Sequence, residues 1–244
     1  MGVIGGADGP TAIVVAGWSG QITGFYGKGL AMLVICMIIA YFLGNISPAT
    51  ILGKFHGIDI KKAGSGNAGT TNALRVLGKK AAVITLIIDI GKGVLAVLLG
   101  RYVGAYYAMQ CIDANLMNAE SYTAFTNYVA NFGGICCGLM VFIGHIWPML
   151  LKFKGGKGVA TAFGVLVTLN PLMGLATLGV VAIVVLITRM VSAGSVCGAI
   201  ALPFIAHFLM PQFVLPGGVM AIIVIIKHRA NIKRILNKTE SRLF

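Results

Sequence analysis

The sequence alternates between long apolar runs and short polar stretches. The runs cover residues 30–52, 81–100, 131–151, 159–188, 192–210 and 212–227. A helix needs ~20 apolar residues to cross a bilayer. The run 159–188 is too long for one crossing, and Asn170-Pro171 divides it because proline cannot continue a helix. The pattern predicts an all-α polytopic membrane protein with about seven transmembrane helices, or five if the helices of 159–210 are re-entrant.

Two stretches fall outside this scheme. Residues 1–29 carry Gly5–Thr11, which is similar to a motif in the β subunits of sodium-pumping decarboxylases, followed by an apolar run too short to cross alone. We expect an external or interfacial extension here, ahead of a single membrane domain over 30–244. Residues 101–130 mix polar, charged and aromatic side chains, and we expect an external loop with a short interfacial helix.

The charge distribution sets the orientation. The formal net charge is +13, but most Lys and Arg residues lie in 54–80, 152–157 and 227–242, between or after apolar runs. This is the positive-inside pattern of a membrane protein and argues against a nucleic-acid partner. It places the three stretches in the cytoplasm, with the N-terminus outside and the C-terminus inside. The five cysteines show no metal-ligand spacing, so we expect core residues and no metal site.

The first polar cluster is the stretch 64–72, which has no large apolar side chain. Its glycines allow the backbone N–H groups to converge on an anion. We expect Thr70–Asn72 to cap a short helix over 73–77. The guanidinium group of Arg75 can bind a phosphate through two parallel hydrogen bonds. The stretch predicts a phosphate site, with an ordinary polar loop as the alternative.

The other polar groups add to this picture. A second glycine–lysine loop, 152–158, opens a helix, and the basic tail 228–234 carries His and Asn. Taken alone, the tail favours a solvated basic helix that faces the lipid headgroups. Asp89 and Lys92 lie one turn apart within a span, where a charge costs roughly 2.5–3.5 kcal/mol, so we favour a structural pair facing the bundle interior.

Together, the three clusters predict a cationic cytoplasmic pocket for a phosphorylated ligand with an apolar part. The sequence has no P-loop motif for a nucleotide, no Gly-x-Ser-x-Gly motif of a serine hydrolase and no pair of histidines at the spacing of zinc ligands. A transporter or channel for an anionic metabolite is the rival class. Against it, the polar clusters lie at one membrane face, and the sequence shows no inverted repeat. A decarboxylase subunit would depend on Gly5–Thr11 alone.

Residues 64–75, 152–161 and 228–234 resemble the three signature motifs of bacterial membrane acyl-phosphate:glycerol-3-phosphate acyltransferases, and the resemblance runs from about 30 to 240. One departure is Asn45-Ile46-Ser47-Pro48, where Gly-Ser-Ile-Pro is common. The resemblance implies transfer of a fatty acyl group from acyl phosphate to the 1-hydroxyl of glycerol 3-phosphate. The products are lysophosphatidic acid and phosphate, in the first step of membrane phospholipid synthesis.

The same resemblance implies a multi-pass protein of the bacterial inner membrane, with 30–244 as the acyltransferase domain and the active site facing the cytoplasm. The implied partners are glycerol 3-phosphate, acyl phosphate and membrane lipid, and no cofactor is expected. A contact with the soluble enzyme that makes acyl phosphate is left open.

The site residues follow from the motifs. The resemblance implies catalytic roles for Ser65, Arg75, Lys157, His228 and Asn231. The first glycine loop predicts phosphate contacts from Gly64, Gly66 and Asn67, and the resemblance implies a phosphate loop at Gly155, Gly156, Lys157 and Gly158. Supporting roles are expected for Asp89, Lys92, His145 and Glu240. Whether a side chain acts as general base is open; we favour a substrate phosphate as the proton acceptor.

Overall fold

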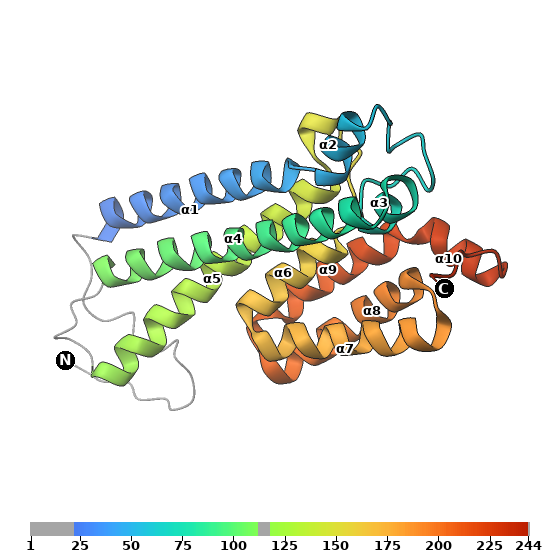
Figure 1. Cartoon of the computed structure of the whole chain (residues 1–244). Helices are drawn as coiled ribbons and strands as arrows, with labels where there is room; N and C mark the ends of the chain where they lie inside the picture. The colour runs from blue at the N-terminus through green and yellow to red at the C-terminus, as the bar shows by residue number, and fades with distance from the viewer. Residues whose placement is uncertain (1–21, 112–117, 244) are drawn as a thin grey trace.

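The computed structural model describes residues 22–111 and 118–243, which form helices and connecting turns without any strand (Figure 1). The helices are α1 (Ile22–Asn45), α2 (Pro48–Phe55), α3 (Thr70–Leu77), α4 (Lys79–Cys111), α5 (Ala119–Ile146), α6 (Val159–Leu169), α7 (Pro171–Thr188), α8 (Val191–Leu209), α9 (Val214–Lys227) and α10 (Arg229–Leu236). Two 3₁₀ turns are η2 (Met149–Leu151) and η3 (Pro211–Phe213). The predicted all-α class is confirmed.

The helices pack as two adjoining groups. The long helices α1, α4 and α5 lie side by side, and α7, α8 and α9 form the second group, with α6 packed against α4 (Figure 1). The short helices α2, α3 and α10 gather at one end of the molecule, where the C-terminus also lies. This arrangement brings the three polar clusters of the sequence to the same end.

Among the described residues, five helical segments are long and apolar enough to cross a membrane, and a sixth is added if the bent pair of η3–α9 and α10 is one span. Helix α6 has 11 residues and so reaches only about 16 Å, roughly half of a hydrocarbon core. The count of seven spans and the orientation of the termini stay predictions.

The expected external loop over 101–130 is wrong. Helix α4 continues to Cys111 and α5 begins at Ala119, so both helices extend well into this stretch. The reason is close helix packing: the backbone of Gly100 lies against Gly133, and Gly104 lies against Val129, where any Cβ would clash. Composition suggested a loop because such packing depends on residues about 30 positions apart.

The boundaries at the N-terminal end also shift. Helix α1 begins at Ile22, inside the expected extension, while residues 1–21 lie outside the described part of the chain, so their external placement stays a prediction. The expected run 30–52 is broken after Asn45 and resumes at Pro48. The break at Asn170 is confirmed, and its side chain accepts a hydrogen bond from Met173 N at 3.0 Å, capping α7.

Candidate active site

Residues from all three polar clusters meet around one cavity of about 440 Å³ at the α3–α10 end of the bundle. The predicted site residues on its wall are Ser65, Asn67, Arg75, Asp89, His145, Lys157, Gly158, His228, Asn231 and Glu240. Four others, Gly64, Gly66, Gly155 and Gly156, do not line the cavity, and Lys92 lies behind Asp89.

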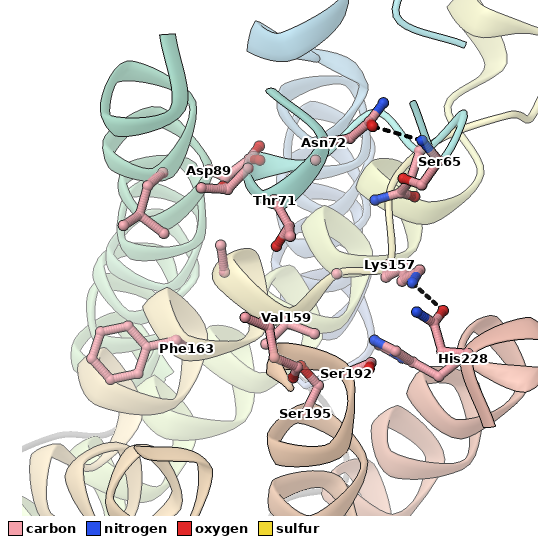
Figure 2. A pocket seen from close by; sticks show the side chains of 18 of the residues that line it. Ser65, Thr71, Asn72, Asp89, Lys157, Val159, Phe163, Ser192, Ser195 and His228 are labelled. Atoms are coloured by element: carbon pink, nitrogen blue, oxygen red, sulfur yellow. Dashed lines mark hydrogen bonds between the residues drawn. The ribbon is translucent and has the colours of Figure 1, made fainter. Parts of the chain in front are cut away.

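The first loop is organised by Asn72, whose side chain is fully buried. Its Nδ2 donates to Ile60 O (3.1 Å) and Ala63 O (3.0 Å), and its Oδ1 accepts from Ser65 N (2.8 Å). The expected capping role is therefore wrong: α3 begins at Thr70 after Gly69, without a side-chain cap. Because Asn72 takes up the Ser65 amide, that amide is not free to bind a ligand, and Ser65 and Asn67 both line the cavity (Figure 2).

Two of the three glycines of this loop determine its shape. Gly64 and Gly66 have φ values of 59° and 70°, a region that favours glycine. The Gly66 amide donates to Ala63 O at 3.1 Å. Neither residue reaches the cavity wall, so we propose that they shape the turn that carries Ser65 and Asn67.

The second loop presents Lys157 and the start of α6. The Gly155 and Gly156 amides donate to Ile146 O (3.2 Å) and His145 O (3.1 Å), which anchors them to the end of α5 and keeps them off the wall. Gly158, with φ 83°, turns the chain into α6. The first turn of α6 lines the cavity, and a helix N-terminus attracts anions through its dipole and N–H groups.

The third cluster is organised by Glu240. Its Oε1 accepts from Ser192 Oγ (2.8 Å) and Asn231 Nδ2 (2.6 Å), while its Oε2 pairs with Arg234 Nε at 2.6 Å. This fixes the Asn231 amide with its oxygen toward Lys157, whose ammonium donates to it. Glu240 thus supports the site through Asn231.

The ionisation states follow from burial. Burial lowers the pKa of Lys157 to about 8, so the side chain is largely cationic at pH 7. His228 lies at the junction of α9 and α10; burial, and next the Lys157 charge, lower the pKa of His228 to about 4. Its Nδ1 lies 2.8 Å from Val224 O and must donate, because a carbonyl only accepts. The neutral ring therefore has an acceptor at Nε2.

Other wall residues were not predicted. Ser192 and Ser195 on α8 line the cavity, and Figure 2 shows them beside Val159. Single serines in an apolar helix carry no spacing signal, so sequence alone could not select them. The wall also has polar residues that were not predicted to line a site, Thr70, Thr71, Asn72 and Ser241. Its apolar part is formed mainly by Leu86, Ile90, Val159, Phe163, Leu178 and Val191.

The cavity is therefore amphipathic. Figure 2 shows Lys157 and His228 toward one side and Phe163 toward the other. A smaller cavity of about 80 Å³ between α6, α7, α8 and α9 shares Phe163, Leu178 and Ser195 with the first, so the apolar side leads toward the interior of the bundle. Such a site fits a ligand with a phosphorylated head and an apolar tail.

Comparison with known proteins gives the same family at three levels. The family model described as glycerol-3-phosphate acyltransferase matches residues 34–238. The glycerol-3-phosphate acyltransferase of Thermoanaerobacter pseudethanolicus is 40% identical over 213 residues, which are 86% of this chain and 95% of the relative. That of Clostridioides difficile strain 630 is 41% identical over 215 residues, 86% of this chain and 95% of the relative.

Solved structures agree. The crystal structure of PlsY (YgiH), an integral membrane glycerol 3-phosphate acyltransferase, in its glycerol 3-phosphate form, has a TM-score of 0.71 and 30% identity, and covers 87% of this chain and 96% of that chain. Its lysophosphatidic acid form has a TM-score of 0.68 and 30% identity, with 87% and 95% coverage. Sequence and structure together show that this chain belongs to the glycerol-3-phosphate acyltransferase family.

Proposed function

We propose that this protein transfers a fatty acyl group from acyl phosphate to the 1-hydroxyl of glycerol 3-phosphate, giving lysophosphatidic acid and inorganic phosphate. The observation that carries the proposal is the amphipathic cavity, with Lys157 and Arg75 on its wall together with an apolar surface from α6 and α7. A phosphate and an acyl chain have matching partners there, and the PlsY structures are described with glycerol 3-phosphate and lysophosphatidic acid.

The chemistry needs positioning more than a strong base. The glycerol hydroxyl oxygen forms a bond to the acyl carbon, the bond from that carbon to the phosphate oxygen breaks, and phosphate leaves with the hydroxyl proton. Acyl phosphate is already activated, so bringing the reactants together and stabilising charge on the leaving phosphate supply most of the catalysis. Lys157 and the N-terminus of α6 suit that second task.

The remaining side chains receive roles by chemistry. Arg75 offers a planar fork for a substrate phosphate, and Ser65 a hydroxyl donor beside it. Asn231, held by Glu240, orients Lys157. His228 accepts a hydrogen bond at Nε2 from the 2-hydroxyl of glycerol 3-phosphate and so orients the substrate, while the proton of the attacking 1-hydroxyl passes to a substrate phosphate.

The active site faces the cytoplasm of a bacterial inner membrane in this proposal. The basic stretches of the sequence lie at the same end as the cavity, and the positive-inside rule places that end inside. Glycerol 3-phosphate and acyl phosphate then arrive from the cytoplasm, and the acyl product passes into the bilayer. A soluble enzyme that makes acyl phosphate is the partner that this geometry allows at the cytoplasmic end.

The purified protein in detergent tests the proposal. Lysophosphatidate and phosphate should form in equal amounts from palmitoyl phosphate and glycerol 3-phosphate. Palmitoyl-CoA should not replace palmitoyl phosphate, because the described wall has no evident nucleotide-binding motif. Comparable turnover with palmitoyl-CoA would contradict the donor, and uptake of glycerol 3-phosphate into proteoliposomes without acyl transfer would favour a transporter.

A further inference from the structure

Three ionisable side chains that the proposed chemistry does not use meet at the base of the cavity. Lys92 Nζ lies 2.8 Å from Asp89 Oδ1 and 2.8 Å from His145 Nδ1, and all three side chains are buried. Asp89 and Lys92 are on α4, whereas His145 is near the end of α5. We call this group the buried triad. Because charged groups at membrane depth are costly and are retained where they have a function, a function should be sought for the triad.

One part of the triad supplies hydrogen bonds at the break that follows α1. In a continuous helix, Gly44 O would accept from the amide of residue 48, but that residue is Pro48, which has no amide proton. Lys92 Nζ donates instead to Gly44 O (3.2 Å) and to Ile46 O (2.8 Å). The ammonium group thus satisfies two carbonyls at the break.

The other part of the triad supports the glycine–lysine loop. The His145 ring joins the triad through Nδ1, which lies 2.8 Å from Lys92 Nζ and 3.4 Å from Asp89 Oδ1. The Nε2 edge lies against Gly156, so closely that a Cβ at Gly156 would overlap it. The Gly156 amide donates to His145 O at 3.1 Å. Gly156 directly precedes Lys157, so the position of the ring sets where the chain enters the phosphate site.

The segment that leads into the loop is also held from the α1 side. Asn45 Oδ1 accepts from Leu150 N at 3.1 Å, and the Tyr41 hydroxyl donates to Trp147 O at 2.9 Å. Asn45 belongs to the segment that departs from the common family pattern. The break in α1, the end of α5 and the loop therefore form one connected structure, with Lys92 at its centre.

We propose that Asp89, Lys92 and His145 act as a positioning unit that holds loop 155–158, and with it Lys157, in register with the rest of the phosphate site. The inference builds on the proposed function, since it concerns the binding of the same phosphorylated substrate. It differs from a simple structural ion pair, which would serve only to hold α4 in the bundle.

A double-substitution cycle tests the contact between ring and loop. Gly156→Ala should raise the apparent Kd for glycerol 3-phosphate roughly tenfold or more, because the new methyl group displaces the loop. His145→Ala removes the ring, so the combined variant should bind no more weakly than His145→Ala alone. Gly179→Ala is the matched control, because its Cβ would meet nothing within 4 Å. Multiplicative effects of the two substitutions would overturn the proposal.

A second experiment separates positioning from stability. Replacing a buried ion pair by apolar residues is often neutral for folding, so Asp89→Leu with Lys92→Met should still give a folded protein. We expect its apparent Kd for glycerol 3-phosphate to rise about as much as in Gly156→Ala. A folded double variant with wild-type affinity would overturn the proposal, and if the double variant fails to fold, the His145–Gly156 cycle decides alone.

The readout is chosen to be independent of the acyl donor. Glycerol 3-phosphate binding is followed as the concentration-dependent rise in unfolding temperature of the purified protein in detergent. A protein that binds glycerol 3-phosphate but does not use acyl phosphate would contradict the proposed function and leave the positioning test intact. Equal binding by wild type and Gly156→Ala would contradict the positioning unit, whatever the donor.

Discussion

The Lys157 ammonium donates a hydrogen bond to Asn231 Oδ1 across 74 positions of sequence. This bond joins the second polar cluster to the third and orients the ammonium toward the cavity. Asn231 is itself held by Glu240 at 2.6 Å, so the position of Lys157 depends on an acidic residue near the end of the described chain. The bond also links the activity of the protein to the charge state of one lysine.

That link predicts an alkaline limit to activity. With the pKa of Lys157 lowered to about 8, the free enzyme loses this cation as the pH rises through that value. We expect kcat/KM for glycerol 3-phosphate to fall above about pH 8, and Lys157→Arg to move the limb to higher pH because arginine stays charged. A limb at the same pH in both enzymes would contradict the assignment.

His228 should not titrate in the working range. Its pKa is lowered to about 4, so the ring is neutral from pH 5 upward and should produce no acidic limb near pH 6–7. We expect His228→Gln to reduce kcat while leaving the shape of the pH–rate profile between pH 5 and 7 unchanged. The exposed His56→Gln is the control. An acidic limb near pH 6–7 that disappears in His228→Gln together with nearly all turnover would make His228 the general base.

Activity should depend on the shape of the Arg75 side chain as well as on its charge. In the structure its Nη2 donates to Ser241 Oγ, which leaves the rest of the fork for a substrate phosphate. Arg75→Lys keeps the charge but loses bidentate geometry, so we expect kcat/KM to fall roughly tenfold, equivalent to one charge-assisted hydrogen bond. Arg229→Lys, at an exposed position, should have little effect. Near-full activity of Arg75→Lys would mean that Arg75 contributes only charge.

Cysteine labelling tests the orientation. In a background without native cysteines, Lys62→Cys and Lys233→Cys should resist a membrane-impermeant reagent in intact cells, because both belong to stretches expected in the cytoplasm. Glu120→Cys, near the opposite end of the bundle at the start of α5, should react. Efficient labelling at Lys62→Cys from outside would overturn the topology.

Much of the site could be predicted from sequence because it depends on local signals. The positive-inside pattern and the glycine-rich motifs predicted that the three polar clusters meet at one pocket. Asn170-Pro171 predicted a helix boundary. The partners of Asn72 and Gly156 could not be predicted. The position of Asn72 in the sequence is typical of a helix cap, but its side-chain amide instead makes hydrogen bonds to three backbone groups of the loop. The sequence around Gly156 is typical of a phosphate contact, but the ring of His145 from another helix lies against this residue.

The half-length of α6 has a consequence for its two ends. Its N-terminus faces the cavity, whereas its C-terminus stops at Leu169, where Arg101 Nη1 donates to Thr168 O at 3.1 Å. A helix carries partial positive charge at its start and partial negative charge at its end. Arg101 therefore meets the negative pole within the bundle, while the positive pole is left for the anionic substrate. In the proposed reaction the short helix would act as an oriented dipole, with one pole neutralised by Arg101 and the other directed at the phosphate of the substrate.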